Sequence, residues 1–94
     1  MIYALSLRER ALLEVEVAKN DYERAGHGKS FLAELDRTFE ALRMMPRRFP
    51  VVYGEVHRAL LRRYPFAVFF RIRLTTVVVL AVVHQRIDPA RWPG

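Results

Sequence analysis

The first half of the chain alternates between apolar and polar positions with the period of an α-helix. Apolar side chains recur three or four residues apart from Ala11 to Tyr22 and again from Phe31 to Leu42, which places them on one face of a helix. Two glycines in the segment 25–28 end the first helix, because glycine readily adopts the left-handed turn that follows many helices. Pro46 ends the second, since the residue before a proline disfavours helical dihedrals. The pattern predicts an antiparallel helical hairpin.

A short strand is predicted before this hairpin, over residues 1–7, which include Ile2, Tyr3 and Leu5. Ser6 and Glu9 have the spacing of a capping box, in which the serine oxygen accepts a backbone N–H and the glutamate bonds back to the serine. We therefore expect the first helix to begin directly after this strand, with Ser6 as its cap.

Beyond Pro50 the period changes to two, which is typical of β-strands. Four segments are rich in β-branched and aromatic residues and are predicted to be strands: 51–53, 56–63, 66–72 and 75–84. Alternation in the segment 56–63 places Arg58 and Arg62 on the same face. The segment 75–84 is apolar at nearly every position, which predicts a central strand covered on both sides. The predicted fold class is α+β: an N-terminal strand, an antiparallel helical hairpin, then a three- to four-stranded antiparallel sheet with the helices on one face.

Length and composition indicate one domain over residues 1–94, because 52% of the 94 residues are hydrophobic and a chain of this size forms a single core. Zero cysteine excludes disulfides, thiolate metal sites and cysteine nucleophiles. The start of the chain lacks the basic segment of a secretory signal. The longest apolar run, Val77–Val83, is far shorter than the ~20 residues that span a bilayer. We expect a cytoplasmic protein with no membrane partner.

Charge is distributed unevenly. Residues 1–45 hold seven basic and eight acidic side chains, whereas residues 46–94 hold nine arginines against Glu55 and Asp88. The helix-free face of the sheet is expected to be apolar in its middle and bare, with arginines around it. Such a surface predicts either a groove or an acidic or phosphate-bearing partner that covers it.

Several catalytic classes lack the residues they need. The four glycines form no phosphate-binding loop, and the two serines, Ser6 and Ser30, are expected at helix starts. His27, His57 and His84 have no metal-ligand spacing. We expect no metal and no cofactor. Arginine stabilises charge on phosphate and histidine transfers protons near neutral pH, so a metal-free ribonuclease remains open.

Segments along the second half resemble the RelE/ParE superfamily of bacterial type II toxin–antitoxin toxins, on the ParE-like side. The segments that carry the resemblance are Pro46–Pro50, Val56–Leu61, Tyr64–Arg71 and Val78–Arg86, followed by Asp88-Pro89 and Trp92. Their order and spacing match the family over nearly the whole chain.

The resemblance implies a plasmid-stabilisation type of toxin that stops growth and is neutralised by a cognate antitoxin in a hetero-oligomeric complex. An acidic, amphipathic antitoxin segment would suit the basic, apolar sheet. ParE-like members trap DNA gyrase without cutting anything themselves, and this is the leading hypothesis. The residues expected to face the target are Arg58, Arg62, Arg71, His84 and Arg86. Those expected to bind the antitoxin are Leu60, Arg62, Phe69, Val78 and Leu80.

Two alternatives remain. RelE-like members are metal-independent endoribonucleases that cut mRNA on the ribosome; here Arg58, His84 and Arg86 would be catalytic. This set is incomplete, because Ala67 stands where such enzymes carry an arginine. The third hypothesis is a non-toxic member that only binds its antitoxin.

Overall fold

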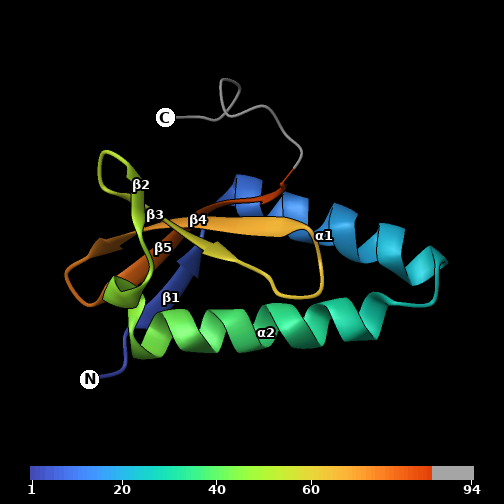
Figure 1. Ribbon diagram of the computed structural model, residues 1–94, viewed down its shortest axis with the longest axis horizontal. Coiled ribbons are helices and arrows are strands. Elements are labelled where there is room, and N and C mark those ends of the chain that lie inside the picture. Colours follow the sequence, from blue (N-terminus) through green and yellow to red (C-terminus); the bar gives the residue numbers. More distant parts are fainter. Residues whose placement is uncertain (86–94) are drawn as a thin grey trace.

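The computed structural model describes residues 1–85, and the segment 86–94, which includes the predicted site residue Arg86, lies outside the described residues. The elements in chain order are β1 (Ala4–Leu7), α1 (Glu9–Arg24), α2 (Gly28–Met44), the short 3₁₀ turn η1 (Pro46–Arg48), β2 (Val51–Tyr53), β3 (Val56–Leu60), β4 (Phe66–Arg73) and β5 (Thr76–His84). Figure 1 shows the two helices as the predicted hairpin, beside one sheet. The predicted α+β class is therefore confirmed.

The sheet has five strands in the order β1-β5-β4-β3-β2. Strands β2 to β5 form the predicted antiparallel sheet. Strand β1 joins it as a fifth strand, parallel to β5, with Ala4 opposite Thr76 and Leu7 opposite Val79. Strand β5 is therefore central, as its continuous apolar sequence predicted.

Both helices bury their apolar stripes against one face of the sheet. The main core contains Ala11, Ala18, Phe31, Leu35 and Leu42 from the helices and Ala59, Leu61, Val68, Phe70, Val77, Val79 and Val82 from the sheet half. Every member is almost fully removed from water, and apolar burial of this kind is the main favourable contribution to folding. The periodicity of the first half therefore identified the helical part of the core correctly.

An aromatic cluster holds the loop between β3 and β4 against the turn of the helical hairpin. The rings of Tyr22 and Phe31 are stacked with centroids 5.0 Å apart. Tyr64 and Phe66 approach Phe31 at 5.4 Å each, within the range of favourable aromatic pairs. The end of the sheet that carries this loop is thus fixed to both helices.

A β-bulge changes which residues of β5 face the helices. The register between β4 and β5 shifts at Phe69/Phe70. Val77 and Val79 face the helices before the shift, and Val82 does so after it. Ala81 and Val83 consequently belong to the opposite face. A bulge of this kind inserts one extra residue, so strict alternation fails beyond it.

The predicted capping box is wrong. The N-cap of α1 is Arg8, which has an extended conformation and makes no side-chain cap bond. The Arg8 N–H instead donates to the Val79 carbonyl at 2.9 Å. Pairing between β1 and β5 therefore keeps the chain extended through Arg8 and leaves Ser6 within the strand.

Strand β3 also ends earlier than predicted, at Leu60. The Leu61 N–H donates to the Phe66 carbonyl at 3.0 Å and closes a loop over residues 62–65. Arg62 therefore lies in this loop, and the strand alternation that paired it with Arg58 does not extend to it. Within the described chain no helix combines the length and apolar character needed to cross a membrane.

Candidate functional site

The helix-free face of the sheet has an apolar centre, formed by Val56, Ala67, Phe69, Ala81 and Val83. Their exposed fractions run from 0% for Ala81 to 7% for Val56 and Val83. The expectation that this centre is bare is therefore wrong. The cluster packs together with Leu80, and little apolar surface of its five members remains accessible.

Two predicted arginines lie on this same face. Arg58 is opposite Phe69, and Arg71, two residues further along β4, is opposite Val78 on β5. Arg58 and Arg71 are therefore diagonal neighbours, a relation that brings long side chains within reach of each other. Arg58 is exposed, whereas Arg71 is half-buried. Within residues 1–85, the Nε of Arg71 is buried and has no hydrogen-bond partner, which is uncommon for a buried polar atom.

The structure places His84 on the other side of the sheet. His84 is opposite Phe66, and the two rings meet at 5.4 Å in an edge-to-face arrangement. Phe66 packs on the main core under the helices. Arg58 and His84 therefore lie on opposite faces, and Arg62 is exposed in the loop between β3 and β4. Of the four predicted target-facing residues within residues 1–85, only Arg58 and Arg71 share a face of the sheet.

The predicted antitoxin-binding residues differ in accessibility. Leu60 and Arg62 are exposed, Leu80 is half-buried, and Phe69 and Val78 are buried. Phe69 and Val78 therefore offer a partner little surface in this conformation.

His57 was not predicted to have a role, and its contacts are structural. Its Nδ1 lies 2.8 Å from the Phe49 carbonyl, a distance at which Nδ1–H donates to that oxygen. The imidazole also stacks on Phe70 at 5.1 Å. His57 thus fastens the segment after η1 to the sheet.

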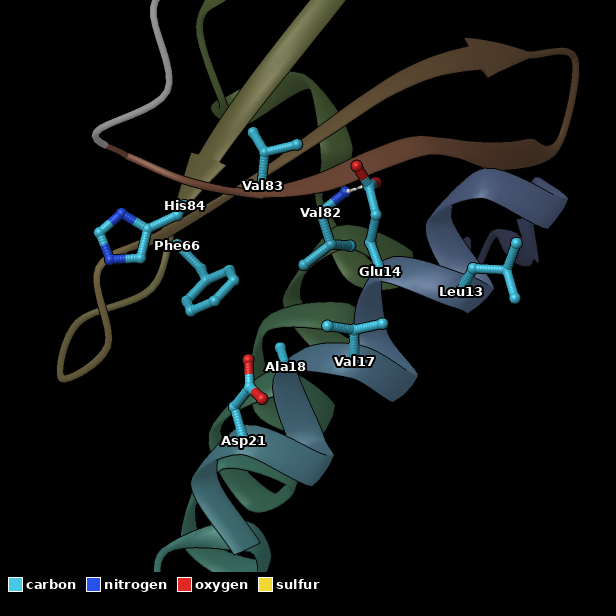
Figure 2. A pocket seen from close by; sticks show the side chains of 9 residues that line it. All are labelled: Leu13, Glu14, Val17, Ala18, Asp21, Phe66, Val82, Val83 and His84. Carbon is cyan, nitrogen blue, oxygen red and sulfur yellow. Dashed lines mark hydrogen bonds between the residues drawn. The ribbon is translucent and has the colours of Figure 1, made fainter. Parts of the chain in front are cut away.

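A hollow of about 320 Å³ lies between α1 and the ends of β4 and β5 (Figure 2). Its lining residues are Leu13, Glu14, Val17, Ala18, Asp21, Phe66, Val82, Val83 and His84. Sequence reasoning missed this hollow, although a signal was present. Leu13 and Val17 are four residues apart and form a second apolar stripe on α1 beside the one that enters the core. They are 56% and 61% exposed.

Glu14 connects α1 to the strand at the edge of this hollow. Its Oε1 accepts the Val82 N–H at 2.8 Å, and its Oε2 is 3.0 Å from Arg10 Nε. Figure 2 shows the Glu14 side chain extending from the helix to the Val82 backbone. As for metals, no group of three or more potential side-chain ligands lies together in the part of the chain that the structure describes.

Comparison with known proteins decides the family. The family model for the ParE toxin of the type II toxin–antitoxin system parDE matches residues 7–89. The chain belongs to the ParE toxin family. This confirms the resemblance drawn from the sequence, and this ParE-family chain is thus a toxin of a type II toxin–antitoxin system. A search of curated proteins finds no match.

Solved structures support the fold of this ParE-family chain. It is similar to a chromosomal ParDE toxin–antitoxin system from P. aeruginosa, with a TM-score of 0.74 and 16% identity over 88% of this chain and 96% of that one. It is also similar to the toxin–antitoxin complex RelBE2 from Mycobacterium tuberculosis, with a TM-score of 0.65 and 21% identity over 89% of this chain and 99% of that one.

Proposed function

We propose that this ParE-family chain stops growth by inhibiting DNA gyrase without cutting nucleic acid itself, and that a cognate antitoxin neutralises it. The observation that carries the proposal is the separation of Arg58 from His84 on opposite faces of the sheet. A metal-free ribonuclease needs its phosphate-binding and proton-transferring groups around one scissile bond. Ala67 supplies no donor for a phosphate either. The ParE family assignment also favours gyrase, because the ParE-like resemblance implies that target.

The antitoxin would contact the basic side of the sheet. Arg58 and Leu60 are exposed on this face, Arg71 lies diagonal to Arg58, and Arg62 is exposed in the loop that follows β3. Arginine binds carboxylates through two parallel hydrogen bonds. An acidic antitoxin segment that also carries apolar residues fits this surface, and the resulting complex is a hetero-oligomer.

Gyrase assays test the proposal. Purified protein at micromolar concentration should inhibit supercoiling and increase the amount of cleaved DNA that gyrase holds. Arg58→Ala should weaken both effects, whereas Arg48→Ala, which removes an exposed arginine from η1, should leave them unchanged. If gyrase supercoils DNA as fast with the toxin as without it, and mRNA on stalled ribosomes is cut, the gyrase target would be rejected in favour of RelE-like activity.

A further inference from the structure

Strand β5 extends past its neighbour on one side. Strand β1 pairs with β5 only from Thr76 to Val79, whereas β5 continues to His84. Within the described chain, the remaining part of that edge has no strand beside it, and the Val82 N–H is held by the Glu14 side chain. An open strand edge is a template for another extended chain, and proteins often block such edges with charged side chains.

The apolar hollow lies directly beside this open edge. Val82 and His84 line it from the strand, while Leu13 and Val17 line it from α1. Both α1 residues remain more than half exposed. An apolar side chain of a bound segment would therefore remove both from water.

Charge around the hollow is opposite to that of the whole chain. The protein carries a formal charge of +6, yet among residues 1–85 no lysine or arginine lines this site, and both acidic residues that line it within that range, Glu14 and Asp21, are on α1. Glu14 is paired with Arg10. Asp21 is exposed and has no ion pair within residues 1–85. The hollow is thus suited to a cationic group next to an apolar one.

We propose that an extended antitoxin segment adds a strand to the open edge of β5, with a backbone carbonyl accepting the Val82 N–H in place of Glu14. An apolar side chain of this segment fills the hollow, and a lysine or arginine near it faces Asp21. This inference rests on the proposed neutralisation by an antitoxin. It adds a second contact, on the helix side of the sheet, with a chemistry opposite to that of the acidic segment expected on the arginines. Strand addition supplies affinity through the backbone and specificity through such side-chain pockets.

Two adjacent leucines provide a matched test. Leu12 and Leu13 are 55% and 56% exposed, but only Leu13 lines the hollow. The binding partner for the assay is the purified cognate antitoxin. Leu13→Arg should lower the affinity for it by at least about tenfold, since a buried apolar anchor is typically worth more than about 1.4 kcal/mol. Leu12→Arg should bind like the wild type. Circular dichroism and thermal unfolding establish that both variants fold.

Charge reversal tests the cationic neighbour. Asp21→Arg should weaken binding several-fold, and this loss of affinity should diminish at high salt. Asp36→Arg, which changes an exposed residue of α2, should leave the affinity unchanged. Amide hydrogen exchange gives the backbone readout. Glu14→Ala should speed exchange at Val82 in the free toxin, and the antitoxin should restore protection. Equal affinities for Leu13→Arg and Leu12→Arg, or no restored protection at Val82, would overturn the inference.

Growth assays separate this inference from the proposed function. Leu13→Arg should still stop growth when expressed alone, but the antitoxin should no longer rescue the cells. A wild-type chain that fails to stop growth would reject the toxin activity, while binding measured with purified proteins would still decide whether the hollow is the docking site.

Discussion

Replacing Glu34 with alanine removes the carboxylate that joins α2 to the loop between β3 and β4. Glu34 is the single buried charged residue among residues 1–85, with 5% of its surface exposed. Its Oε2 accepts the Arg63 N–H at 2.8 Å. The loop carries Arg62, one of the residues expected to face the target, so Glu34 fixes the position of a proposed binding loop.

The size of the effect follows from this one bond. A hydrogen bond to a charged group contributes roughly 1.5–3 kcal/mol, and a buried donor left unsatisfied costs a similar amount. We expect Glu34→Ala to lower the free energy of unfolding by about 2 kcal/mol. In a domain of about 60–100 residues each kcal/mol shifts Tm by about 4–8 °C, so Tm should fall by roughly 8–16 °C. Glu34→Gln keeps an acceptor oxygen and should lose about half as much free energy.

Urea and thermal unfolding of the purified toxin measure these differences. Asp36→Ala is the control, because it removes an exposed carboxylate two residues along the same helix and should change stability by less than about 0.5 kcal/mol. If Glu34→Ala were as stable as Asp36→Ala, or if Glu34→Gln were as unstable as Glu34→Ala, the acceptor role of Glu34 would be refuted.

Three further changes test other parts of the structure. Leu74 has a φ of 53° and is 94% exposed, so Leu74→Asn should raise the free energy of unfolding by up to about 1 kcal/mol and shift the urea midpoint upward, and a lower midpoint than that of Leu74→Ala would contradict this. Burial, followed by the charge of Tyr64, raises the pKa of Tyr22. The neutral phenol is therefore favoured in the folded state, and the stability that Tyr22 contributes is complete below a pH of about 10 and is lost as the pH rises. Unfolding of Tyr22→Phe should accordingly depend less on alkaline pH than that of the wild type, and identical slopes would exclude this origin. His57→Phe keeps a ring on Phe70 but loses the hydrogen bond to the Phe49 carbonyl, so it should lower the free energy of unfolding by about 1 kcal/mol. His57→Ala should lower it distinctly more, and equal urea midpoints for these two variants would contradict the stacking contribution.

Local patterns in the sequence predicted the helices and the strands well. The stripes from Ala11 to Tyr22 and from Phe31 to Leu42 identified the helical core, because burial on one face imposes the helical period on the sequence. The pairing of β1 with β5 left no such local signature. Strand partners distant in sequence are selected by tertiary contacts, and the same pairing keeps Ser6 from capping α1.

The candidate site depended on features that alternation alone does not encode. Strict alternation placed Val77, Val79, Ala81 and Val83 on one face of the last strand. The bulge opposite Phe69/Phe70 moves Ala81 and Val83 to the other face, and it places His84 under the helices, away from Arg58. The end of β3 at Leu60 likewise separated Arg62 from Arg58. Arg86 lies outside the described residues, so its role as a target-facing residue stays a prediction.

The parallel pairing of β1 with β5 has a consequence for synthesis. Strand β1 leaves the ribosome early, but its partner leaves only after both helices and three other strands have been translated. The helical hairpin and the β3–β4–β5 meander can form from neighbouring residues, whereas the contact between β1 and β5 must close a loop across most of the chain. Contacts of this range slow folding, so a nascent toxin remains incomplete, with an unpaired and aggregation-prone strand, until the last strand of the sheet emerges.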